Sequence, residues 1–432
     1  MSFVLMPGTE DWHKTIPIYV TMNMFSFLST NSLIFLLFWG LMSGCDAGSD
    51  LELPDHAAAI NQNGSIIVSS GTYSLEQSPM SVRWDGPAPS CLESNGELTP
   101  VQFEENGGGH TLLWFSASVP AGETKTFVPS EQEECTGSSF LWEREGETSY
   151  RLSIDGVPGI EYHFPEFDID NYEETMKPFH HVFSPDGSQL ITKGIGGTYT
   201  HHRGIFYGYN HVRIGEDGES MNLWSAREDR GEVTEHRDFV REWTGPVFGG
   251  HEVEIEWKDS DGEIFADEIR RVKVYKRSGG ELLIDVESDL TSRVNVLHLD
   301  GDLHHAGIQF RASQYVDDNP EHSRFLRPET WIDYPENEEI DDPENYTNLP
   351  WNAFQFVVEG EPYTVGYFSH PGNPQGGEMS ERLYGRFGEF IPGIVLDESE
   401  TLTLRYRFLI TSGHEIDRER MEHEYTLYSG TY

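Results

Sequence analysis

The sequence predicts an all-β protein built as a large antiparallel β-sandwich. Three observations carry this prediction. Short runs of alternating or β-branched apolar residues recur along most of the chain, turn-forming pairs such as Asp85-Gly86 separate them, and no long amphipathic helix interrupts them. Roughly twenty such strands in one chain imply a large sandwich assembly with few or no long helices.

The first 44 residues look like an export signal. Residues 33–42 (LIFLLFWGLM) form an uncharged apolar run that is too short to span a bilayer, which takes about 20 residues, but suits the core of a signal peptide. The run ends in LMSGC, which resembles the lipobox of bacterial lipoproteins, and by that resemblance Cys45 becomes the lipidated N-terminus. A translation start at Met22 or Met24 gives a leader of ordinary length, and a short transmembrane anchor is the alternative. We therefore expect an exported protein, lipid-anchored in the cell envelope on its outer membrane, periplasmic or surface face.

The chain is strongly acidic. Without residues 1–44, 28 basic and 72 acidic residues leave a formal charge of −44. Nucleic acid and the anionic surface of a bilayer are excluded as partners, because this charge repels both. The acidic residues are spread along the chain, which indicates a solvated surface and suits a salty environment. An anionic ligand would need local arginines to overcome this field, and Arg203, Arg311 and Arg382 are candidates.

Two cysteines follow Cys45. In an oxidising compartment two leftover cysteines more often pair than stay free, so Cys91 and Cys135 are predicted to form a disulfide. Closing so long a loop would stabilise the fold by roughly 3–4 kcal/mol through restriction of the unfolded chain. Neither cysteine has another Cys or His at metal-ligand spacing, so a Cys/His metal site is not expected.

Strands are expected in order along the chain after a polar linker at residues 45–64. Residues 65–150, with runs such as SIIVSSGTY and HTLLWFSASV, form an N-terminal β segment. Residues 151–415 form the main sandwich domain, in which HEVEIEW and RVKVY alternate so regularly that each should have one solvated face. Residues 317–349, rich in Pro, Asn and acids, are expected to form a long surface loop or lid. Residues 416–432 form a C-terminal tail, whose DRERMEHEY run is the most helix-like stretch.

Histidines gather in residues 178–224, and the main domain is organised around this stretch. Its THHRGIFYGY run places two proton carriers and a fixed cation at the mouth of a strand, which suits binding or chemistry on a polar or anionic small molecule. The alternative is a structural pair of histidines satisfied by backbone carbonyls. The histidines of this stretch are His180, His181, His201, His202 and His211.

Two further segments carry histidines at strand ends. The HLDGDLHHAGIQFR segment repeats the pattern of a His pair, a glycine and a strand with an arginine, and SHPGNP fixes a third histidine in a rigid turn, shortly before RLYGRFGEF. Three separate histidine-bearing strand ends favour one shared cleft over independent core positions. The residues concerned are His298, His304, His305, Arg311, His370, Asn373, Arg382, Tyr384 and Arg386.

No sharp metal or nucleotide motif is present in the sequence. It contains no HExxH, CxxC pair, EF-hand acid ladder, GxSxG elbow or phosphate-binding loop. Neighbouring residues on a strand point to opposite faces, so one member of each His pair can line a cleft while the other faces the core. No cofactor is firmly predicted, and a divalent metal held by His202, His305 and His370 stays open.

Five segments together resemble a bacterial family known as PmoA, or methane oxygenase PmoA. They are PFHHVFSPDGSQLIT, THHRGIFYG, HHAGIQFR, YFSHPGNP and YGRFG, and the resemblance covers roughly residues 150–410. Such proteins are of largely unknown function, are exported and accompany polysaccharide-degrading or sugar-modifying genes. The resemblance therefore implies a supersandwich akin to galactose mutarotase and a carbohydrate ligand. The label names an oxygenase, but the methane monooxygenase subunit behind it is a bundle of transmembrane helices, and none is predicted after residue 45.

We expect a carbohydrate-active enzyme that transfers protons on a sugar or sugar acid, as an epimerase or mutarotase, a lyase or a hydrolase. In this interpretation His202 and His305 act as base and acid, Arg203 and Arg311 hold a carboxylate or ring oxygen, and His370 orients the substrate. Two alternatives stay open, a non-catalytic glycan-binding lipoprotein and a metal-dependent oxygenase. The other residues expected to bind substrate are His181, His201, His304, Asn373, Arg382 and Tyr384.

Overall fold

The protein folds into antiparallel β-sheets, as predicted. The computed structural model describes residues 57–105, 108–132, 135–225, 231–302, 304–331, 336 and 346–430. The predicted export signal and the predicted lipidation site Cys45 lie outside these residues. No helix in the described ranges combines the length and apolar character that crossing a membrane requires.

A seven-stranded sheet forms the N-terminal part of the described chain and has its own apolar core. Its first strand lies inside the predicted linker, because residues 58–60 pair with the following strand. Cys91 is disulfide-bonded to Cys135, with their Cα atoms 6.0 Å apart. The strands, in spatial order, are β1 (Ala58–Ile60), β2 (Ile66–Ser69), β7 (Thr124–Ser130), β4 (Cys91–Ser94), β5 (Glu97–Glu105), β6 (Thr111–Val119) and β3 (Leu75–Arg83).

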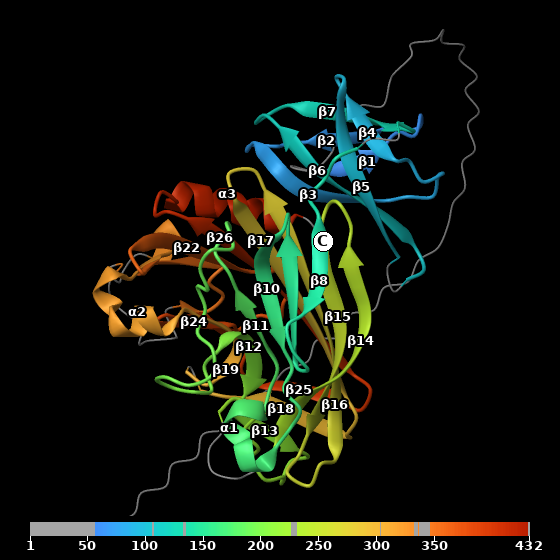
Figure 1. Ribbon diagram of the computed structural model, residues 1–432. Coiled ribbons are helices and arrows are strands. Elements are labelled where there is room, and N and C mark those ends of the chain that lie inside the picture. Colours follow the sequence, from blue (N-terminus) through green and yellow to red (C-terminus); the bar gives the residue numbers. More distant parts are fainter. Residues whose placement is uncertain are drawn as a thin grey trace, which may run out of the picture. The chain divides into compact units, whose positions relative to one another are not determined.

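Eight strands form the sheet that we call the first large sheet (Figure 1). It begins before residue 150, so the predicted boundary of the main domain falls inside it. The strands, in spatial order, are β23 (Glu378–Arg382), β24 (Arg386–Phe390), β19 (Ala306–Arg311), β12 (Gly204–Tyr209), β11 (Phe179–Val182), β10 (Val157–His163), β9 (Ser149–Ile154) and β8 (Phe140–Arg144).

Another eight strands form the second large sheet, whose central strands are the longest of the described chain. The regular alternation expected for HEVEIEW is present, since Val253, Ile255 and Trp257 are buried while Glu254 is exposed. The strands, in spatial order, are β14 (Val233–Thr244), β15 (Gly249–Lys258), β16 (Ile264–Arg277), β17 (Glu281–Ser292), β26 (Thr401–Ser412), β22 (Glu361–Ser369), β21 (Trp351–Val358) and β20 (Arg324–Leu326).

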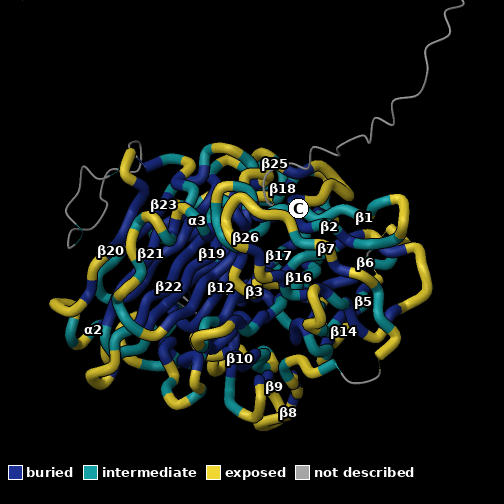
Figure 2. Tube along the Cα trace, turned by 90° about the horizontal axis from the view of Figure 1, so that it is seen from above, coloured by how far each residue is buried: buried dark blue, intermediate teal, exposed yellow. Residues whose placement is uncertain are grey.

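The two large sheets share one continuous apolar core, which makes them a sandwich. Ile205 and Phe310 of the first sheet belong to the same cluster of buried side chains as Ile284 and Phe408 of the second. Strands β12 and β19 are buried along their whole length, and exposed residues gather in the connecting loops (Figure 2). Because β12 has no solvated face, the face turned away from the core must be covered by loops.

The remaining elements are short. Strands β13 (His211–Ile214), β18 (Val296–Asp300) and β25 (Ile394–Asp397) form a three-stranded sheet, so His211 and His298 belong to this sheet. The predicted surface loop or lid is partly regular, since it contains the end of α2 and all of η2, β20 and η3, and residues 332–335 and 337–345 lie outside the described chain. The helices are η1 (Ile169–Asn171), α1 (Tyr172–Thr175), α2 (Gln314–Asp318), η2 (Pro320–His322), η3 (Glu329–Trp331) and α3 (Arg418–Ser429).

Candidate functional site

The candidate site lies on the outer face of the first large sheet, where β12, β19 and β24 are neighbours. Backbone pairing places Gly204 of β12 opposite Arg311 of β19, and Arg311 opposite Arg386 of β24. Side chains alternate along a strand, so Ile308 enters the core while Gln309 and Arg311 point to the outer face. The sheet thus brings side chains from distant parts of the sequence into one row.

The loop that carries His201 and His202 folds over this face and is held by one buried ammonium group. The Nζ atom of Lys193 donates hydrogen bonds to the carbonyl oxygens of Gly194 and Tyr199, both at 3.2 Å, and of His202 at 3.1 Å. The amide of His202 also donates to the carbonyl of Tyr199 at 2.9 Å. The position of the two histidines therefore depends on Lys193.

His202 is buried among other rings. The centre of its imidazole lies 4.3 Å from that of His201, 5.8 Å from Phe206 and 6.2 Å from Trp224. Neither ring nitrogen of His202 has a hydrogen-bond partner among the described residues, and the same holds for Nε2 of His201. Buried polar atoms are normally hydrogen-bonded, because an unmade bond costs free energy. These nitrogens therefore point to a ligand.

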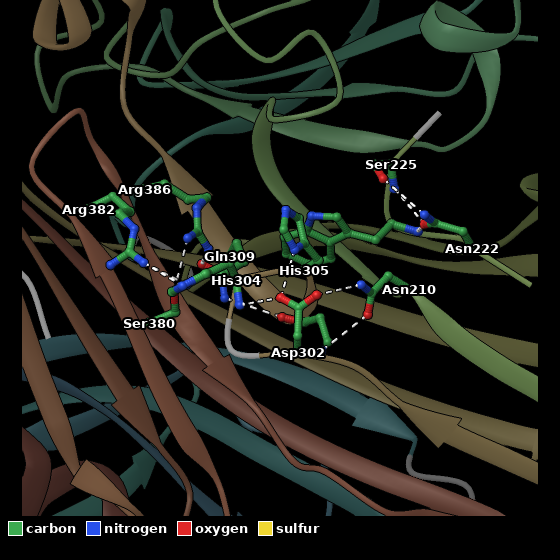
Figure 3. A network of polar contacts seen from close by, with 12 residues as sticks. Asn210, Asn222, Ser225, Asp302, His304, His305, Gln309, Ser380, Arg382 and Arg386 are labelled. Atoms are coloured by element: carbon green, nitrogen blue, oxygen red, sulfur yellow. Dashed lines mark hydrogen bonds and ion pairs between the residues drawn. The ribbon is translucent and has the colours of Figure 1, made fainter. Parts of the chain in front are cut away.

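A second loop brings His304 and His305 to the start of β19, and Asp302 orders it. Oδ1 of Asp302 accepts a hydrogen bond from the His304 amide at 3.0 Å and lies 2.7 Å from Nδ1 of His305. Its Oδ2 accepts a hydrogen bond from the Asn210 side chain at 2.9 Å (Figure 3). A carboxylate at one ring nitrogen orients an imidazole and stabilises its protonated form. His305 and Asp302 are thus a candidate acid–base pair.

The β23–β24 hairpin contributes two arginines to the same place (Figure 3). Nη2 of Arg382 lies 2.7 Å from Nε2 of His304. Arg386 is 1% exposed, and its guanidinium donates to the Gln309 side chain at 3.1 Å and to the Ser380 hydroxyl at 3.0 Å. The Arg382 side chain therefore connects the hairpin to the loop of His304 and His305.

Two further basic side chains lie close to His202. Lys177 is fully buried, and its amine nitrogen lies 4.4 Å from the centre of the Phe206 ring and donates to the carbonyl of Trp224. Burial, and then Arg203 and Arg270, lowers the pKa of Lys177 well below its ordinary value. Arg203 is also fully buried and donates to the carbonyl of Glu174 at 2.7 Å. Its Nε has no partner among the described residues.

Arg311 completes this group of cations. Its guanidinium lies 4.8 Å from the centre of the Tyr384 ring and donates to the Tyr384 carbonyl, while Asp317 lies 3.5 Å from its Nη2. Nε of Arg311 lacks a hydrogen-bond partner within the described chain. We call the assembly the histidine–arginine cluster; it consists of His201, His202, Arg203, His304, His305, Arg311, Arg382, Tyr384 and Arg386, with Lys177 and Lys193 beneath it.

Positive charge is concentrated in this cluster, although the formal net charge of the chain is −45. Lys193, Arg203 and Arg386 donate to carbonyl, amide and hydroxyl oxygens, and no described carboxylate forms an ion pair with them. Buried charges are usually paired, because desolvating an isolated ion is costly. The cluster is therefore suited to an anionic group of a ligand.

His201, His202 and His304 of the cluster are uncharged at neutral pH. Burial, and then Arg386, lowers the pKa of His202 well below its ordinary value. Burial, and then Lys177, lowers the pKa of His201 to about 2, and burial lowers that of His304 to about 4. A neutral imidazole can accept a proton or a hydrogen bond, so these side chains can serve as bases.

The arginines and Asp302 keep their charges. Burial lowers the pKa of Arg203 and of Arg311 to about 10, which leaves both protonated at neutral pH. Burial acts to raise the pKa of Asp302, but hydrogen bonds from the His304 amide, Asn210 and His305 outweigh it and lower the pKa. The cluster thus combines neutral bases, fixed cations and one ionised carboxylate.

His370 lies elsewhere, which corrects the predicted triad of His202, His305 and His370. It follows β22 of the second large sheet, where its Nδ1 accepts a hydrogen bond from the Gly372 amide at 3.0 Å and its ring lies 5.4 Å from Tyr428 of α3. The core separates this strand end from the outer face of the first large sheet. The described residues contain no group of three or more His, Cys, Asp or Glu side chains arranged to hold a metal ion.

Two other predicted contacts have local structural partners. The Asn373 side chain accepts from the Arg405 amide at 2.8 Å and donates to the Arg405 carbonyl at 2.9 Å, which closes the turn after β22. His181 lies on β11, where Nδ1 is 2.9 Å from the Thr192 hydroxyl and the ring packs edge-on against Phe179. Neither residue is part of the histidine–arginine cluster.

Sequence reasoning assigned no role to four residues that build the site, whereas Arg386 was among those expected at the shared cleft. The four are Lys177, Lys193, Tyr199 and Asp302. A signal was present for Lys177, because a lysine inside the apolar and histidine-rich run MKPFHHV has little chance of reaching solvent. No local pattern marks Lys193, whose importance comes from three backbone carbonyls that meet only in the folded loop.

Comparison with known proteins places most of the chain in one family. The model of a family of unknown function, DUF6807, matches residues 149–426, a range that contains every residue of the histidine–arginine cluster. The match does not carry the PmoA name that the motifs resemble, and it assigns no activity. No curated protein matches the chain. The chain belongs to the DUF6807 family of unknown function.

Proposed function

We propose that the histidine–arginine cluster binds the carboxylate of an acidic sugar and transfers protons at the carbon next to that carboxylate. One observation carries the proposal: Arg203 and Arg386, buried cations that form no ion pair with a described carboxylate, belong to the same cluster as His201 and His202, whose ring nitrogens include three without a partner in the described chain. The cations suit the acid group of the ligand, and the neutral imidazoles suit a carbon acid that must lose a proton.

A sugar suits the site because charged and aromatic side chains alternate there. The Tyr384 ring lies between Arg311, at 4.8 Å, and Tyr199, at 5.4 Å. Aromatic faces pack on the apolar face of a pyranose ring, whereas arginines bind a carboxylate in a defined geometry. The motif resemblance to exported proteins that accompany sugar-modifying genes favours the same class of ligand.

In the proposed reaction, His202 removes the hydrogen at C5 of a uronate as a proton. The electron pair of the broken C–H bond moves into the carboxylate, and Arg203 and Arg311 stabilise the added negative charge. His305, oriented by Asp302, then delivers a proton. Delivery to the opposite face of C5 gives an epimer, whereas delivery to the oxygen leaving C4, as that C–O bond breaks, gives an unsaturated product.

Hydrogen exchange in heavy water tests the first step of this proposal, whether the product is the epimer or the unsaturated sugar. The full chain is incubated with galacturonate, glucuronate, mannuronate and their short oligomers, and deuterium at C5 is measured by NMR and mass spectrometry. We expect exchange with at least one of them. H202N should abolish exchange while the protein still unfolds cooperatively, and H370A should retain it, since His370 lies outside the cluster.

The outcomes separate the main alternatives. Binding without exchange in the wild-type protein would mean a glycan-binding protein without catalysis. If the protein bound no uronate, the proposal as a whole would be contradicted. If H202N and H370A lost exchange equally, the loss would reflect destabilisation of the protein and not a role of His202 in the reaction.

A further inference from the structure

We infer that Tyr199 forms a stacking platform for a second sugar ring, so that the ligand is an acidic oligosaccharide. This inference rests on the proposed function. The side chain of Tyr199 is 50% exposed, whereas His202, whose ring centre lies 5.2 Å away, is 3% exposed. An exposed aromatic face therefore continues directly from the buried part of the cluster.

The backbone of Tyr199 is held in an unfavourable conformation. Its φ angle is +54°, in the left-handed region that glycine and asparagine tolerate and tyrosine rarely adopts. Three hydrogen bonds impose this conformation: the Tyr199 carbonyl accepts from Lys193 and from the His202 amide, and the Thr198 amide donates to the Gln314 side chain at 3.0 Å. Strain of this kind clusters at functional sites, where the surrounding structure fixes a side chain in place.

The position of the Tyr199 ring relative to Arg311 indicates the direction in which a bound oligosaccharide would extend. Arg311 stacks on Tyr384, and the Tyr384 and Tyr199 rings lie 5.4 Å apart with an angle of 37° between their planes. The charged end of a ligand at Arg311 thus has an aromatic surface beside it, which leads outward to Tyr199. A sugar ring linked to the bound uronate would extend over Tyr199 toward solvent.

A ligand series tests the inference. Galacturonate, its dimer and its trimer, and the same series of mannuronate, are titrated against wild-type protein by calorimetry. In the series that binds, we expect the dimer to bind roughly threefold to tenfold more tightly than the monomer, as one aromatic contact contributes. Y199N should remove this gain, so that its affinities for monomer and dimer become equal, and Y199F should keep the gain.

The choice of variants separates stacking from folding. Asparagine accepts the left-handed backbone conformation, so Y199N should unfold at the same temperature as wild type or above it. Equal affinities of wild-type protein for monomer and dimer, or an equal loss of both in Y199N, would overturn the role of Tyr199. Failure of all monomers and oligomers to bind would instead remove the proposed function on which the inference rests.

Discussion

Arg386 illustrates how a single residue connects the elements of the site. It is almost fully buried, and its three described hydrogen bonds go to the Tyr384 hydroxyl, the Gln309 amide oxygen and the Ser380 hydroxyl. These partners are neutral, so they fix the guanidinium without cancelling its charge. A fixed, uncancelled charge is what recognition of an anion requires.

Replacement of Arg386 by glutamine should therefore weaken binding of the uronate by roughly 10-fold to 100-fold, because a hydrogen-bonded charge contributes about 1.5–3 kcal/mol. The control is R237Q, which removes the same charge from an exposed side chain of β14. Isothermal titration of both variants checks the prediction. If R237Q weakened binding as much as R386Q, the effect would come from net charge and not from the site.

Helix α3 illustrates stabilisation at the scale of an element. It lies over the second large sheet, and its Glu424 accepts hydrogen bonds from Arg277 of β16 at 2.9 Å through both carboxylate oxygens. Arg277 and Glu424 are each 3% exposed, so this ion pair ties the C-terminal helix to the sandwich in a region of low dielectric constant.

E424Q should destabilise the protein by about 3 kcal/mol, because it removes the carboxylate that accepts two hydrogen bonds from the buried Arg277 and leaves that charge the longer contact with Glu281, at 3.5 Å. E419Q, an exposed position of the same helix, should change the free energy of unfolding by less than about 0.5 kcal/mol. Urea unfolding of the two variants measures the difference. Similar values for both would show that α3 is held by its apolar contacts alone.

The strands were predictable from the sequence, whereas the sheet that each strand joins was not. Alternation along β12 and β15 is a local property, and it was sufficient to identify the fold class. The pairing of β12 with β19 makes the strands that follow His202 and His305 hydrogen-bonded neighbours in the first large sheet. The predicted convergence of the histidines was wrong for His370, because β22 pairs with β21 and β26 in the other sheet. Strand pairing depends on contacts far apart in sequence, and no local pattern encodes it.

At the scale of the whole molecule, buried histidines make the free energy of unfolding depend on pH. Nε2 of His180 lies 2.8 Å from Nε2 of His251 between the large sheets. Burial lowers the pKa of His180 well below its ordinary value of 6.5 and that of His251 to about 3. The unfolded chain binds these protons at higher pH than the folded one. The stability from these histidines is thus fully present above about pH 6.5 and is lost as the pH falls below it.

Glu389 has the opposite effect. Burial raises its pKa from 4.5 to about 7, although Ser369 and Tyr367 donate hydrogen bonds that oppose this shift. Its folded-state pKa exceeds that of the unfolded chain. Its contribution to stability is therefore fully present below about pH 4.5 and is lost as the pH rises through about 7.

Two variants separate these contributions. The free energy of unfolding of the wild-type protein should fall as the pH is lowered from 6.5 to 5. H251F should make this fall shallower, by up to about 1.4 kcal/mol per pH unit for one proton, and E389Q should make it steeper. Urea unfolding at several pH values provides the measurement. Parallel profiles for all three proteins would show that these groups do not control acid stability.

Because Lys193 anchors the loop of His202, we expect ligand binding to weaken at alkaline pH at which the chain is still folded. Burial, and then Arg311 and Arg203, lowers the pKa of Lys193 from 10.5 to about 8. Above that pH the neutral amine has two hydrogens for three carbonyl oxygens, so the loop of His202 loses one of its bonds. Deprotonation also removes the cost of a buried charge, so this group does not lower the free energy of unfolding as the pH rises.

Ligand affinity should therefore decline reversibly with a midpoint near pH 8 while the chain stays folded, and K193R should move the midpoint upward. Ligand affinity and the free energy of unfolding are both measured across this pH range. A simultaneous loss of both would contradict the prediction, because it would show that the whole chain unfolds.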